Sequence, residues 1–221
     1  ARVRSQDEKE APVSAIAATI LALLAFIMAF TFGIVSDRYD ARKALVREEA
    51  NAIRTAWARS DFLPEPDRGE AVRLLRSYLE GRLSAVQANE MTRLRAAVLE
   101  SGRIQRQLWD MAVVNARKDM NSDVAALYVE SLNDLASLHA SRVNVGLHAR
   151  LPGGLWLALL ALVAVSMLAV GYHTAIARSR RSWIMMMLAL SFSLVITLIA
   201  ALDRPEGGYL PVSQQPLEDV R

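Results

Sequence analysis

Three long stretches of the chain are continuously apolar, at residues 13–35, 155–176 and 183–202. None of them contains Asp, Glu, Lys or Arg. A helix of about 20 residues, which rises about 1.5 Å per residue, crosses a hydrocarbon core of roughly 30 Å. Backbone groups in lipid have no water with which to form hydrogen bonds, so we expect each stretch to be a transmembrane helix.

The region between the first two stretches, residues 36–154, is polar and shows the spacing of amphipathic helices. Its apolar residues recur at three- and four-residue steps in three runs: Val72, Leu75, Leu79 and Leu83, then Ile104, Leu108 and Met111, then Leu127, Tyr128, Leu132 and Leu135. We expect the first span to continue as a helix up to the turn at Pro64. Gly102 permits a break between the first two runs, and Ser122 or Asp123 can cap the last helix.

The pattern therefore predicts an all-α membrane protein. Three transmembrane helices lie in this chain, and an extramembrane domain of about four helices lies between the first two. Three shorter segments remain: residues 1–12, 177–182 and 203–221.

Residues 177–182 indicate the orientation, because they carry three arginines and no acid. Short cytoplasmic loops are rich in Lys and Arg, so Arg178, Arg180 and Arg181 predict a cytoplasmic loop. Residues 1–12 are then a cytoplasmic basic linker, and the helical domain and the tail lie outside. Asp203 and Arg204 are expected at the membrane interface, where the ends of spans often carry charge.

The composition argues against several classes of function. The chain has 26 basic and 23 acidic residues, interleaved along the polar region, and this balance argues against nucleic-acid binding. It has no cysteine, and its three histidines lack the spacing of a helical metal pair. No phosphate loop, nucleophile elbow or zinc-protease motif occurs. We therefore expect no enzyme activity, no cofactor and no metal.

The first span has a face suited to lining a pore. Thr19, Phe26, Phe30 and Gly33 fall on one side at helical steps. A ring of such helices places Phe26 and Phe30 at an apolar constriction, and such constrictions gate pores by dewetting. In the alternative interpretation, the two phenylalanines only pack against neighbouring helices or lipid.

Beyond the apolar stretch, the same predicted helix carries a polar face, formed by Asp37, Glu48, Asn51 and Thr55. Small alanines beside it permit close approach of another helix, so the face predicts a subunit seam or an ion pathway. In the alternative, Glu48 only forms ion pairs, with one of the arginines of the same helix: Arg38, Arg42 or Arg59.

The C-terminal tail is neither strongly charged nor of a typically disordered composition. We expect it to dock onto the helical domain through Leu210, Val212 and Leu217. If the tail is free instead, truncation after Arg204 leaves the stability of the protein unchanged.

Several motifs resemble a known family: "LLAFIMAFTFG", "EEANAIRTAWARSDFLPEP", "LHASRVNVGLHARLPGGLWLAL", "VGYH" and "DRPEGGYLPVSQQPL". They make nearly the whole chain similar to the bestrophin-like proteins, an uncharacterised prokaryotic family of integral-membrane proteins with a domain of unknown function. The resemblance implies a bacterial inner (plasma) membrane protein, with the helical domain in the periplasm if the orientation above holds. It also implies a fourth span upstream of the basic linker, and no catalytic residues. Bestrophins themselves are pentameric anion channels, but their large helical region is cytoplasmic.

Two functional hypotheses follow. The first is a homo-oligomeric ion channel, with a pore lined by the first span and its extension. The second is a non-conducting scaffold or accessory subunit in the lipid bilayer that binds a protein partner through its helical domain. The oligomeric state discriminates between them, because only a channel of the first kind requires a ring of identical subunits.

Overall fold

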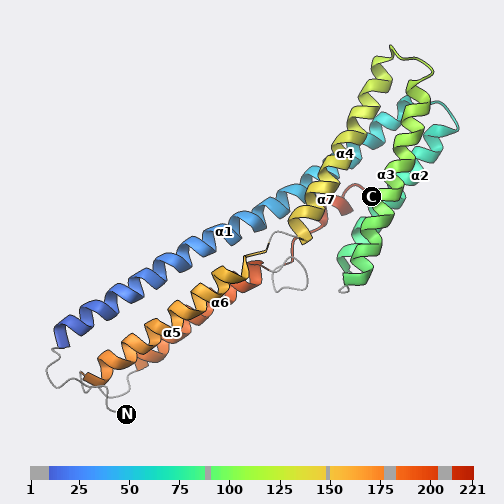
Figure 1. Cartoon of the computed structure of the whole chain (residues 1–221). Helices are drawn as coiled ribbons and strands as arrows, with labels where there is room; N and C mark the ends of the chain where they lie inside the picture. The colour runs from blue at the N-terminus through green and yellow to red at the C-terminus, as the bar shows by residue number, and fades with distance from the viewer. Residues whose placement is uncertain (1–9, 88–90, 148–149, 177–182, 204–210) are drawn as a thin grey trace. The chain divides into compact units, whose positions relative to one another are not determined.

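The computed structural model describes residues 10–87, 91–147, 150–176, 183–203 and 211–221. The described residues form helices and no strand, so the predicted all-α fold is confirmed (Figure 1). In chain order the elements are α1 (Glu10–Arg59), the 3₁₀ helix η1 (Ser60–Phe62), α2 (Asp67–Gln87), α3 (Met91–Ala116), α4 (Asp123–Leu147), α5 (Gly153–Ile176), α6 (Trp183–Asp203) and α7 (Gln215–Glu218).

The chain divides into two compact units. The membrane unit comprises Ala1–Asp37 and Arg150–Arg204, and the helical domain comprises Arg38–Ala149 and Pro205–Arg221. In the described parts of the chain, three helices are long and apolar enough to cross a membrane, and they contain the three apolar stretches. The chain is therefore a multi-pass membrane protein.

In the membrane unit, α5 and α6 pack against the N-terminal part of α1 (Figure 1). Leu24 and Met28 of α1 and Leu159 of α5 are buried together, in contact with Phe192 and Ile196 of α6. Most of the other large apolar side chains of these helices face outward. Lipid tails are as apolar as these side chains, so such faces are stable in a bilayer.

Asp203, the last residue of α6, ties the end of that helix to the beginning of α5. Its carboxylate accepts a hydrogen bond from the backbone N–H of Leu151, at 2.8 Å, and one from the indole N–H of Trp156, at 3.4 Å. The sequence predicts only a charge at the membrane interface, and the structure gives this residue specific partners as well.

The helical domain encloses one apolar core between the C-terminal part of α1 and helices α2, α3 and α4. Ile53, Leu75, Leu108 and Leu135, one from each helix, are completely buried. The expected domain of about four helices is therefore confirmed.

One predicted helix boundary is wrong. Gly102 does not break a helix, because it lies within the continuous helix α3, which begins at Met91. Glycine inside a helix costs only about 1 kcal/mol relative to alanine. Burial of Ile104 and Leu108 on the next turns outweighs this cost. The predicted cap is confirmed, since the Ser122 hydroxyl accepts a hydrogen bond from the backbone N–H of Ala125.

The C-terminal tail docks onto the helical domain, as expected. Leu217 of α7 is fully buried in the domain core, and Val212 and Val220 pack against it. Leu210, the third predicted docking residue, lies outside the described residues.

Candidate functional site

In the membrane unit, α1 has one covered face and one open face. Its buried residues Ala17, Leu24, Met28, Thr31 and Val35 recur at helical steps and mark the side that packs against the rest of the unit. The predicted pore residues occupy the opposite side: Thr19 and Gly33 are at least partly exposed, and Phe26 and Phe30 are 66% and 65% exposed. In this unit, therefore, they do not pack against a neighbouring helix.

In the helical domain, three of the predicted polar residues of α1 face a groove. The groove, which we call the acidic groove, has a volume of about 460 Å³. It is lined by Glu48, Asn51, Ala52 and Thr55 of α1 and by Ser131, Asp134, Ser137 and Leu138 of α4. Asp37 is not part of it, since that residue belongs to the membrane unit. Among the described residues, Glu48 forms no ion pair with Arg38, Arg42 or Arg59. Arg59 pairs instead with Glu130 of α4.

A second groove lies on the other side of α4. This donor groove has a volume of about 280 Å³. It is lined by Gly102, Gln105, Arg106, Leu108 and Trp109 of α3 and by Leu132, Asn133, Leu135 and Ala136 of α4. The amide nitrogen of Gln105 is buried there and has no acceptor in the described part of the chain. Nothing in the sequence pattern singles this groove out, because its residues come from two helices.

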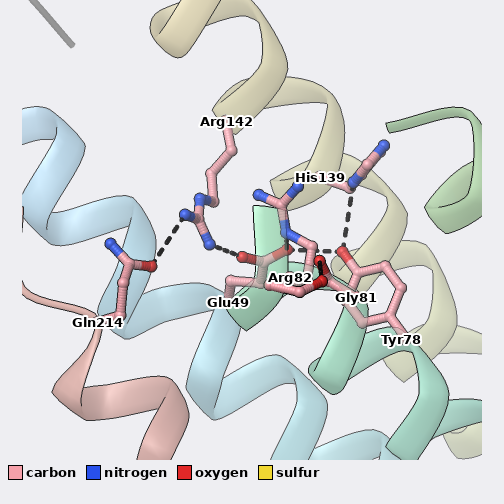
Figure 2. A network of polar contacts seen from close by, with 8 residues as sticks. Glu49, Tyr78, Gly81, Arg82, His139, Arg142 and Gln214 are labelled. Carbon is pink, nitrogen blue, oxygen red and sulfur yellow. Dashed lines mark hydrogen bonds and ion pairs between the residues drawn. The ribbon is translucent and has the colours of Figure 1, made fainter. Parts of the chain in front are cut away.

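A buried polar network centred on Glu49 joins four segments of the helical domain (Figure 2). Glu49 of α1 is completely buried. Its carboxylate accepts a hydrogen bond of 2.6 Å from the Tyr78 hydroxyl, lies 3.2 Å from Nε of Arg82, and pairs with Arg142 of α4.

The network extends from this carboxylate to α4 and to the tail. His139 of α4 places its Nδ1 at 3.3 Å from the Tyr78 hydroxyl. Arg142 donates a second hydrogen bond, of 3.3 Å, to the side-chain oxygen of Gln214, which precedes α7. Figure 2 shows Glu49 between the guanidinium groups of Arg82 and Arg142. One carboxylate therefore contacts two cations, the buried Arg82 and the partly buried Arg142.

The electrostatics of the network follow from burial and from these two cations. Burial raises the pKa of Glu49, but Arg82, Arg142 and the Tyr78 hydroxyl together outweigh it and bring that pKa below its ordinary value. Burial, and then the charge of Glu49, raises the pKa of Tyr78. Burial and Arg82 lower the pKa of His139. The ionised carboxylate, the neutral phenol and the neutral imidazole are thus all favoured near neutral pH.

The sequence contained a signal for this network that the prediction did not use. Glu49 falls between Val46 and Ile53 on the apolar stripe of its helix, at three- and four-residue steps. Arg82 continues the stripe of Leu75 and Leu79 in the same way. A charge within a buried stripe requires an opposite charge nearby, so the two residues could have been paired.

Four of the predicted interface charges lie outside the described residues: Arg178, Arg180, Arg181 and Arg204. Within the described ranges, no group of three or more His, Asp or Glu side chains has an arrangement that could hold a metal ion.

Comparison with known proteins identifies a family. The model of the Bestrophin-like domain matches residues 1–217, which is nearly the whole chain. No curated protein and no solved structure matches it significantly.

Proposed function

Because the chain belongs to the Bestrophin-like family, we propose that it is a homo-oligomeric ion channel of the bacterial inner membrane. In this proposal α1 lines the pore and the helical domain lies in the periplasm. Thr19, Phe26, Phe30 and Gly33 line the membrane part of the pathway.

The open face of α1 carries this proposal. A pore-lining helix contacts its own subunit on one side and the water-filled pathway on the other. Leu24 and Met28 supply the contact with the subunit, and Phe26 and Phe30 are exposed on the opposite side, where the proposal puts the pathway. When copies surround one axis, the two phenylalanines, four residues apart, form neighbouring apolar rings of the kind that gate pores by dewetting.

The chemistry of the spans favours a passive pore. The three apolar stretches contain no Asp, Glu, Lys or Arg. Ion-coupled transporters and proton pumps normally carry such residues within the membrane, so this composition argues for a channel rather than a pump. The sequence contains no recognised catalytic motif, and the proposal therefore includes no enzymatic step.

A non-conducting accessory subunit is the second candidate. Its support is the pair of open grooves on the helical domain, which offer room for a protein partner. This function requires one copy within a larger complex, and the purified chain would then be monomeric.

Single-channel recording tests the channel proposal. We expect purified protein in planar bilayers to conduct, and Phe30→Ala to raise the single-channel conductance because it removes a ring of bulky side chains. Leu190→Ala is the matched control, since Leu190 is a 70% exposed apolar residue of α6 that the proposal places away from the pore.

Two results would count against the proposal. An absence of current from reconstituted oligomers, over a range of pH, calcium concentration and voltage, would contradict channel activity. An equal change of conductance in Phe30→Ala and Leu190→Ala would contradict the assignment of the pore to α1.

A further inference from the structure

The acidic groove presents carboxylates that have no partner within the chain. Glu48 and Asp134 line it from α1 and α4, and both are exposed. Neither side chain forms an ion pair or a hydrogen bond with any described residue. Some other acids of the domain are paired with an arginine of their own helix, as Glu70 is with Arg73 and Glu100 with Arg103. The groove thus offers two free carboxylates.

The donor groove has the opposite chemistry. Arg106 lines it and, in the described structure, has no ion-pair partner. Arg95 precedes Arg106 by 11 residues, and Arg117 follows it by 11, directly after the end of α3. Eleven residues make about three helical turns, so all three arginines lie on one side of the helix. Each is exposed, and Arg95 and Arg117 likewise have no carboxylate partner among the described residues. We call these three residues the arginine stripe.

Two further features make the stripe suitable as a binding surface. Trp109 lines the donor groove and is 38% exposed, and tryptophan and arginine are the side chains most enriched at interaction hot spots. The buried amide nitrogen of Gln105 needs an acceptor, and a carboxylate from outside the chain is one.

The occupant that fits both surfaces is a second copy of this chain. One surface supplies unpaired acceptors, the other supplies unpaired donors, and both lie on the same domain, on two sides of α4. A contact between two different surfaces of identical subunits is heterologous, and heterologous contacts form rings when the rotation between neighbouring subunits closes. A two-fold contact in which either groove met its own copy would instead place like charges opposite each other.

We propose that the acidic groove of one subunit binds the arginine stripe and donor groove of the next, head to tail around a ring. This inference rests on the proposed homo-oligomeric function and names the surface that assembles it. Charge pairs of this kind determine which surfaces meet, and Trp109 provides the apolar anchor.

Charge reversal tests the pairing in the full chain in detergent, with particle mass measured by light scattering. We expect Glu48→Arg and Arg106→Glu each to lower the mass toward that of the monomer, because each creates like charges in every contact of the ring. The double variant Glu48→Arg/Arg106→Glu restores opposite charges in every contact, so it should recover the oligomer. Arg73→Glu is the matched control, since this exposed arginine of α2 pairs with Glu70 of its own helix.

Cross-linking provides a second measurement that does not depend on destabilising the ring. The chain has no cysteine, so introduced thiols are unique. With a short bis-maleimide, the double variant Glu48→Cys/Arg106→Cys should form a ladder of covalent dimers, trimers and larger species. Each single cysteine variant should remain uncross-linked, because a head-to-tail contact never brings two identical residues together.

The outcomes separate this inference from the proposed function. The head-to-tail contact is overturned if the wild type is oligomeric and neither single charge reversal changes its mass. It is also overturned if a single cysteine variant forms a covalent dimer. Both results leave the channel proposal standing. A wild type that is monomeric at all concentrations overturns both. Assembly of the wild type only with a different protein also overturns both and supports the accessory subunit.

Discussion

At the scale of single residues, the helical domain depends on a carboxylate that sequence analysis did not identify. Glu49 is the only acid in contact with Arg82 and Arg142 among the described residues of the network. Two guanidinium groups that are largely removed from water carry a large desolvation cost when they have no counter-charge. The neighbouring residue Glu48 looks equivalent in the sequence, yet it is exposed and has no such role. The packing of the apolar stripe decides which of the two is buried.

We expect Glu49→Gln to destabilise the helical domain strongly. The amide keeps the size of the side chain and its hydrogen bonding to Tyr78 but removes the charge that offsets Arg82 and Arg142. Removal of one partner from a buried ion pair costs about 3 kcal/mol or more. The free energy of unfolding, from denaturant titration of the full chain in detergent, measures the loss. Glu80→Gln, an exposed acid of α2, is the control and should change it by less than about 0.5 kcal/mol.

The pH dependence of the stability difference between wild type and Glu49→Gln shows whether the lost charge causes it. The pKa of Glu49 is lowered in the folded state, so the ionised carboxylate contributes its full stability above the ordinary carboxyl pKa of about 4.3. That contribution decreases as the pH falls through the lower, folded pKa. The gap between wild type and Glu49→Gln should therefore be constant near neutral pH and narrow in acid. A gap that stays equal down to the lowest accessible pH would mean that packing, not charge, causes the destabilisation.

At the scale of elements, the sequence predicts helices well and their ends less well. The stripes of apolar residues are local and periodic, so α2, α3 and α4 are readable from the chain. The break near Gly102 was wrong because the residue's own preference is weak compared with the burial of its neighbours. The grooves could be predicted only in part: Glu48, Asn51 and Thr55 share a helix face, but Asp134 joins them only through the packing of α4.

The short C-terminal helix α7 should contribute to the stability of the helical domain. Leu217 is completely buried in the core, and replacement of a buried leucine by alanine costs about 3 kcal/mol. We expect Leu217→Ala to lower the free energy of unfolding by about this amount, measured by denaturant titration in detergent. Glu218→Ala, an exposed change in the same helix, is the control. Equal stability of Leu217→Ala and wild type would show that the tail is not docked in solution.

At the scale of the whole molecule, the three spans were the most predictable feature, because a lipid solvent imposes long uncharged helices whatever the rest of the fold. The orientation depends on a different signal, the three arginines at 178, 180 and 181. Short loops rich in Lys and Arg remain on the cytoplasmic side of the membrane, and this loop contains no acid that would weaken the signal. The helical domain of a bestrophin is cytoplasmic, so the family resemblance and the arginine loop predict opposite sides for this domain.

Labelling of introduced cysteines decides between these two orientations. The chain has no cysteine of its own, and Ser84 is an exposed residue of the helical domain. Because the arginine loop predicts a periplasmic domain, we expect a membrane-impermeant maleimide added to spheroplasts to modify Ser84→Cys. It should spare Ser179→Cys, which lies between Arg178 and Arg180 in the sequence, until the cells are lysed. The reverse pattern would place the helical domain, and both of its grooves, in the cytoplasm. Since both grooves lie on that one domain, the head-to-tail contact survives either result, and only the compartment in which the ring of domains sits changes.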